Sequence, residues 1–113
     1  MQFSPSSDLI KFSLVKTYIQ TNKQKHFNES IIILEQLLHN SPKWSYLWRL
    51  LAKSSSKANK KGISYIALAE EALIKKNFIK AKNYVDLANK QPSVPSSYKL
   101  RGADIVARIK MKK

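Results

Sequence analysis

Residues 65–92 read YIALAEEALIKKNFIKAKNYVDLANKQP, and this segment predicts two helices with a turn between them. Its first half is dominated by alanine, leucine and glutamate, which all have high helix propensity. Asn77 interrupts the run. Phe78 then begins a second set of apolar residues spaced by three and four, which is the spacing of one helix face. We therefore expect two helices here, near residues 63–76 and 78–90.

Apolar residues at the same spacing predict four more helices outside this segment. In the first of them, the stripe expected to face the core consists of Leu9, Ile10, Leu14, Tyr18 and Ile19. Ser41 followed by Pro42 is typical of a helix start, because a proline at the first helical position lacks an amide hydrogen that would have no partner there. The sequence thus predicts an all-α fold in one domain, residues 1–113, with helices near 7–22, 27–40, 42–57, 63–76, 78–90 and 96–111.

The helix expected to begin at Pro42 carries two tryptophans one turn apart. Because Trp44 and Trp48 fall on one helix face, a core position is the simpler interpretation, and it is favoured more strongly for Trp48. Tryptophan is also favoured at interaction hot spots. The candidates for contact with a partner are Trp44 and three residues off that face, Tyr46, Arg49 and Lys53.

The pattern of residues 65–92 resembles the tetratricopeptide repeat, in which large and small residues alternate at set positions of two helices. The matching residues are Tyr65, Leu68, Ala69, Ala72, Phe78, Ala81, Val85, Ala88 and Pro92, the last one place early. A second, partial match consists of Trp48, Leu51 and Ala52. The resemblance implies antiparallel helical hairpins stacked as a short solenoid. Small side chains such as Ala69, opposite Ala81 and Ala88, would let the helices cross closely.

A narrower resemblance covers the chain from about Ser41 onward. Residues 48–52 (WRLLA) and 65–72 (YIALAEEA), followed by Arg101, Asp104 and Ile105, are similar to the C-terminal repeat region of BepA-like periplasmic zinc metallopeptidases. In that family the repeats hold protease substrates or outer-membrane assembly partners. The resemblance implies a periplasmic or cell-envelope location and a partner of that kind. Taken alone, the sequence has no export signal and reads as cytoplasmic.

The sequence lacks the patterns that catalysis and metal binding require. It has no cysteine and no His-Glu-x-x-His motif, and its two histidines, His26 in an expected turn and His39 near a helix end, are thirteen residues apart. Glu70 and Glu71 are adjacent, so on a helix they diverge; we expect them to be solvated or paired with Lys75. The chain is expected to be no enzyme and to need no cofactor or metal.

A net charge of +14 raises the alternative of a nucleic-acid partner. Eighteen of the cationic residues are lysines and three are arginines. Arginine is the residue that recognition of bases and phosphates favours, and codon bias in an AT-rich genome would also enrich lysine. The lysines near residues 75–90 are expected to form a solvated face. No apolar run is long enough to span a membrane.

Together, these observations predict a non-catalytic protein–protein interaction module. Its partner would be a protein or peptide, and the chain would be the accessory repeat domain of a cell-envelope metallopeptidase. The alternative is a basic protein associated with nucleic acid or the ribosome. Salt dependence of binding to arbitrary DNA or RNA distinguishes the two.

Overall fold

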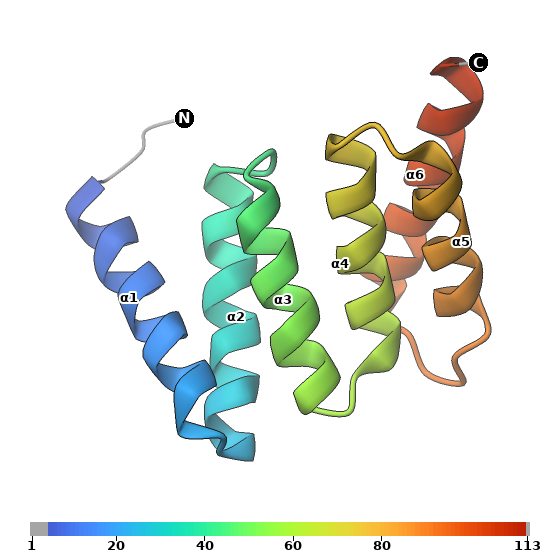
Figure 1. Cartoon of the computed structure of the whole chain (residues 1–113). Coiled ribbons are helices and arrows are strands. Elements are labelled where there is room, and N and C mark those ends of the chain that lie inside the picture. The colour runs from blue at the N-terminus through green and yellow to red at the C-terminus, as the bar shows by residue number, and fades with distance from the viewer. Residues whose placement is uncertain (1–4, 113) are drawn as a thin grey trace.

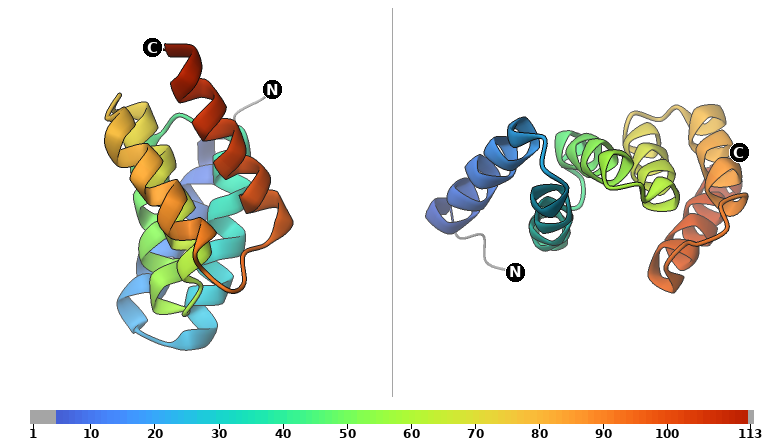
Figure 2. Two further views of the ribbon diagram at one scale, coloured as in Figure 1. Left: turned by 90° about the vertical axis from the view of Figure 1, so that its right-hand side faces the viewer. Right: turned by 90° about the horizontal axis from the view of Figure 1, so that it is seen from below.

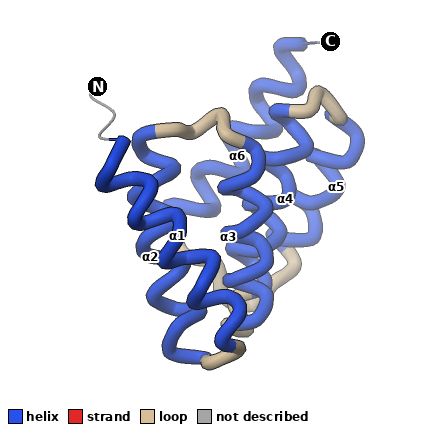
Figure 3. Tube along the Cα trace, turned by 60° about the vertical axis from the view of Figure 1, so that its left-hand side comes forward, coloured by secondary structure: helices blue, strands red, loops and turns tan. Residues whose placement is uncertain are grey.

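The computed structural model describes residues 5–112, and this part of the chain contains six α-helices and no strand. The helices are α1 (Pro5–Thr21), α2 (Gln24–Asn40), α3 (Ser45–Lys57), α4 (Lys61–Ile74), α5 (Phe78–Asn89) and α6 (Ser96–Lys112). Short loops connect them, and successive helices run in opposite directions (Figures 1 and 3). The expected all-α fold of stacked helical hairpins is confirmed. Residues 1–4 and 113 of the expected domain lie outside the described residues.

The helices form a curved row. Each helix packs against the next one, and α4 also packs against α6. Seen along the helices, α2 and α6 lie on the same side of the row, with α3 and α4 behind the space between them (Figure 2, right). None of the helices in residues 5–112 combines the length and the apolar character that crossing a bilayer requires.

The face that α1 buries differs from the one expected. Val15 and Ile19 are buried, but Leu9, Ile10 and Leu14 are exposed. α1 lies at one end of the row (Figure 1), where it packs chiefly on α2. The expected stripe was therefore wrong for three of its residues, because apolar side chains occur around most of this helix and only one side has a neighbour.

The junction between α2 and α3 also corrects an expectation. α3 begins at Ser45 and not at Pro42, and its N-cap residue is Trp44. Ser41 instead follows α2, where its backbone N–H donates to the carbonyl of Leu37 at 2.9 Å. Ser41 thus completes the last turn of α2, and Pro42 lies in the loop that follows.

Apart from the exposed Pro92, the residues matched to the repeat pattern are in the core or at its edge. Eight of them are buried, namely Trp48, Leu51, Ala52, Ala69, Ala72, Ala81, Val85 and Ala88. Three more pack partly buried against that core, namely Tyr65, Leu68 and Phe78. Ala69 and Ala81 have no exposed surface at all. The small residues therefore lie at the buried positions of α4 and α5, as the pattern predicted.

Gly102 brings α6 close to the rest of the array. A Cβ atom at this position would lie 3.0 Å from Cδ1 of Ile66 in α4 and 3.4 Å from Cγ1 of Val85 in α5. The first distance is tighter than ordinary van der Waals contact, so the Ile66 side chain would have to shift to admit a larger residue. The close approach of α6 positions one wall of a surface groove.

Three turns contain a residue with left-handed backbone geometry. These are Asn22 (φ 58°), Asn59 (φ 62°) and Lys76 (φ 62°). Asparagine adopts this conformation more readily than most residues, whereas lysine does so at a conformational cost. Lys76 therefore occupies a position in the turn between α4 and α5 for which asparagine would be better suited.

Candidate binding groove

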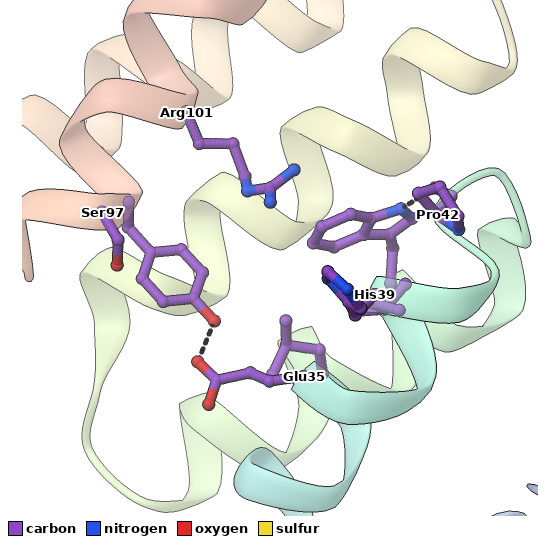
Figure 4. A pocket seen from close by; sticks show the side chains of 9 residues that line it. Glu35, His39, Pro42, Ser97 and Arg101 are labelled. Atoms are coloured by element: carbon purple, nitrogen blue, oxygen red, sulfur yellow. Dashed lines mark hydrogen bonds between the residues drawn. The ribbon is translucent and has the colours of Figure 1, made fainter. Parts of the chain in front are cut away.

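Two adjoining pockets lie beside α6, and the first of them lies between α6 and α2. The tyrosine pocket has a volume of ≈ 200 Å³ and is lined by Glu35, Leu38, His39, Pro42, Trp48, Leu51, Ser97, Tyr98 and Arg101 (Figure 4). The basic pocket has a volume of ≈ 440 Å³ and is lined by Pro42, Lys43, Trp48, Glu70, Leu73, Ile74, Lys76, Phe78, Arg101 and Arg108. Because the pockets share Pro42, Trp48 and Arg101, we treat them as one surface, the α2–α6 groove.

A hydrogen bond between α6 and α2 crosses one end of the groove. The hydroxyl of Tyr98 donates to Oε2 of Glu35 at 2.5 Å (Figure 4). Burial raises the pKa of the Tyr98 hydroxyl above its ordinary value of 10.0. The hydrogen bond to Glu35 and the negative charge of Glu35 also raise this pKa, while the nearby Arg101 lowers it. The neutral, hydrogen-bonding form of Tyr98 is therefore favoured.

This pKa shift predicts how stability depends on alkali. The folded protein keeps the Tyr98 proton at pH values where the unfolded chain has released it. The stability from this group is therefore fully present below the ordinary tyrosine pKa and is lost progressively as pH rises from that value toward the raised pKa of the folded state. From about pH 9 to about pH 11, urea unfolding should show a steeper loss of stability for the wild type than for Tyr98→Phe. Equal slopes for the two proteins would contradict the assignment.

Trp48 lies at the centre of the groove and lines both of its pockets. Only 3% of its surface is exposed, and Nε1 donates to the carbonyl of Pro42 at 2.7 Å. The guanidinium of Arg101 lies 5.0 Å from the centroid of the indole ring. Arg101 also donates from Nη1 to Oε2 of Glu70 at 2.7 Å. A cation–π contact and a charged hydrogen bond thus hold Arg101, from α6, against α3 and α4.

The basic pocket has an apolar floor and a cationic rim. Beside Trp48, the floor consists of three partly buried side chains, Leu73, Ile74 and Phe78. On the rim, Arg108 donates from Nε to Oδ2 of Asp104 at 2.9 Å. Lys43 and Lys76 are exposed and form no ion pair within residues 5–112. Their charges are therefore available to a ligand.

No family model, curated protein or solved structure matches this chain. The similarity to tetratricopeptide repeats and to BepA-like peptidases therefore stays a prediction. The evidence for a function comes from the groove itself, which presents a buried indole, two engaged carboxylates and several cations on one concave side. Such an arrangement can bind a ligand by apolar contact with Leu73, Ile74 and Phe78 and by charge.

Two of the predicted partner residues, Trp44 and Tyr46, lie outside the groove. Trp44 is 43% exposed, so its expected core position was wrong. Its ring lies 5.1 Å from that of Phe12 in α1, and the Tyr46 ring lies 5.9 Å from the same side chain. Both residues therefore help to attach α1 to the start of α3 while leaving part of each ring exposed.

Arg49 and Lys53, the other predicted partner residues, are exposed but are not brought into the groove. Arg49 donates from Nε to Oε2 of Glu71 at 2.8 Å, and Lys75 lies 3.3 Å from the same oxygen. Arg49, Glu71 and Lys75 line a separate pocket on α3, α4 and α5. The four residues thus lie in different parts of the surface, and their role in binding stays a prediction.

The expectation for the two adjacent glutamates was correct in one respect and wrong in another. The predicted pair of Glu71 with Lys75 forms. However, both glutamates are largely buried, Glu70 at 8% and Glu71 at 9% exposed, and each also binds an arginine from another helix. Residue spacing within one helix could not reveal the partners Arg101 and Arg49, because both lie in other helices, far from the glutamates in sequence.

The two histidines lie near opposite ends of α2. His26 lies in the first turn of α2 and not in a loop, because α2 begins at Gln24. Its ring stacks on Tyr18 at 4.5 Å, and Nδ1 lies 2.7 Å from Oγ1 of Thr21. His39 is near the end of α2, as expected, and lines the tyrosine pocket. Within residues 5–112, no three potential metal ligands gather in one place.

Proposed function

We propose that this chain is a non-catalytic protein-interaction module of the tetratricopeptide type, and that its α2–α6 groove binds a peptide segment of a partner. The observation that supports this most directly is the placement of Trp48 and Arg101. They lie at the centre of a groove to which α2, α3, α4 and α6 all contribute. Arginine is enriched at binding hot spots, and the nearly buried Trp48 holds the partly exposed Arg101 in place.

Rigidity supports the same proposal. The indole of Trp48 is held by its hydrogen bond to Pro42, and the guanidinium of Arg101 by Glu70 and by the indole. Side chains that are already ordered lose little conformational entropy when a ligand binds. The groove would therefore bind without first having to assemble its central contacts.

The resemblance to BepA-like peptidases extends this proposal to a setting. We propose that the chain acts as the accessory repeat domain of a cell-envelope metallopeptidase, where it holds a substrate or an assembly component. A pull-down from an envelope fraction, with the chain as bait, should then recover a zinc peptidase or one of its substrates. If a variant with a blocked groove recovers the same proteins equally well, this result would count against a role in a cell-envelope peptidase.

Nucleic-acid binding is the alternative. All three arginines are engaged in ion pairs, with Glu71, Glu70 and Asp104. The exposed lysines are spread over several helices. These features favour a protein ligand over a phosphate backbone, which a continuous basic strip would track. Filter binding of arbitrary RNA at two ionic strengths would favour the alternative if affinity were high and fell steeply with salt.

The proposed function can be tested with peptides selected from a displayed library on the intact chain. Ile74→Lys places a charge on the groove floor, and Ile79→Lys makes the same change on α5, where Ile79 is 79% exposed and lines neither pocket. We expect peptides selected on the wild type to bind Ile74→Lys about tenfold more weakly and Ile79→Lys equally well. Failure to select any peptide, or equal binding to both variants, would count against the groove.

A further inference from the structure

We infer that the basic pocket binds an acidic peptide segment that carries at least one apolar side chain. This inference rests on the proposed function and specifies the chemistry of the partner. It follows from two properties of the pocket that occur together, its unpaired cations and its apolar floor.

The cationic rim is built from three separate elements. Lys43 comes from the loop between α2 and α3, Lys76 from the turn between α4 and α5, and Arg108 from α6. The two connections lie at the same end of the molecule (Figure 1). Neither lysine has a carboxylate partner within residues 5–112. A ligand carboxylate placed over the pocket would therefore meet positive charge from more than one side.

The backbone at Lys76 adds to this argument. Its φ of 62° lies in the left-handed region, which asparagine occupies in two other turns of the molecule. A lysine is not required for this turn, so the turn itself does not explain its presence. Its side chain, however, brings a charge to the rim of the pocket.

The apolar floor of the basic pocket indicates that a ligand with charge alone would not fit the pocket well. Leu73, Ile74 and Phe78 are partly buried and surround a pocket of ≈ 440 Å³. An apolar side chain from the ligand would remove the remaining surface of these residues from water. The ligand that satisfies both rim and floor has carboxylates on either side of an apolar residue.

A polyanion without apolar side chains fits the pocket less well. RNA phosphates would meet the lysines of the rim but would leave the floor uncovered. The lining also includes the carboxylate of Glu70, and the adjacent Arg101 is already bound to it at 2.7 Å. An acidic peptide avoids both problems, because its side chains can be placed separately over the rim and the floor.

Fluorescence anisotropy with three blocked, labelled peptides tests this inference on the intact chain. The first peptide has glutamates on both sides of a leucine and a phenylalanine. In the second the leucine and phenylalanine are replaced by serine, and in the third the glutamates are replaced by lysine. We expect the first to bind about tenfold more tightly than either of the others.

A pair of double variants locates the site. Lys43→Gln with Lys76→Asn removes both free rim charges, and asparagine suits the left-handed turn, so this variant should fold. Lys25→Gln with Lys90→Asn removes the same charge from exposed positions that line neither pocket. The first double variant should weaken binding of the acidic apolar peptide about tenfold. The control should leave it nearly unchanged.

Each alternative outcome has its own meaning. Equal loss in both double variants would show attraction to overall charge and would overturn the inference. Tighter binding of RNA than of any peptide, with the same dependence on Lys43 and Lys76, would also overturn it. If the peptides selected on the wild type prove neutral or basic yet are lost in Ile74→Lys, the inference fails while the proposed function stands.

Discussion

Replacing Trp48 by alanine is expected to lower the free energy of unfolding by about 3–5 kcal/mol. Only 3% of Trp48 is exposed, so almost the whole side chain is buried. Its loss would leave a large cavity between α3 and its neighbours, remove the hydrogen bond to Pro42 and take away the ring beneath Arg101. Chemical denaturation followed by far-UV circular dichroism measures the change.

The matched control for this substitution is Trp44→Ala, in the same segment of the chain. Because Trp44 is 43% exposed and mainly contacts Phe12, we expect a loss of about 1 kcal/mol. Equal losses for the two tryptophans would mean that α3 is rotated relative to the arrangement described. A small loss of stability for Trp48→Ala would contradict the placement of Trp48 in the core. It would also contradict its placement as the floor that the two pockets share.

The second large effect is expected from adding bulk where α4 and α5 meet. Ala69→Leu or Ala81→Leu should each lower the free energy of unfolding by about 1–3 kcal/mol, because both alanines are fully buried and the added atoms have no space. The same denaturation measurement applies. It tests the feature that the repeat-like pattern depends on, which is a small residue at a close helix crossing.

Ala103→Leu is a suitable control, since Ala103 is exposed on α6 and leucine is also a good helix former. Its stability should stay within about 0.5 kcal/mol of the wild type. Unchanged melting of both Ala69→Leu and Ala81→Leu would show that the crossing of α4 and α5 is looser than their burial implies.

The fold was predictable because local spacing carries most of its information. In α5 the residues Ala81, Val85 and Ala88 repeat on one side of the helix and are buried as predicted. Ala69 is also buried as predicted, in α4, whose buried residues lie on most sides of the helix. α1 shows where this reasoning fails. Its apolar residues are spread around the helix, so only the position of α2 decides that Val15 is buried while Leu9 is not.

The groove was much less predictable, because its contacts join residues far apart in sequence. Tyr98 and Glu35 are 63 residues apart, and no local pattern connects them. Glu70 and Arg101 are 31 residues apart. Sequence reasoning placed Trp48 correctly in the core but selected Tyr46, Arg49 and Lys53 as partner residues by their position off the Trp48 face. That criterion identifies exposed side chains without showing which of them share a concave surface.

The packing of each helix on its neighbour in sequence also bears on how the molecule is made. Contacts of this kind can form in chain order, so α1 to α5 can associate while the chain is still being synthesised. The space between α2 and α6, in contrast, has only one wall until Tyr98, Arg101 and Arg108 have emerged. A nascent or truncated chain that ends before α6 would therefore lack one wall of the groove.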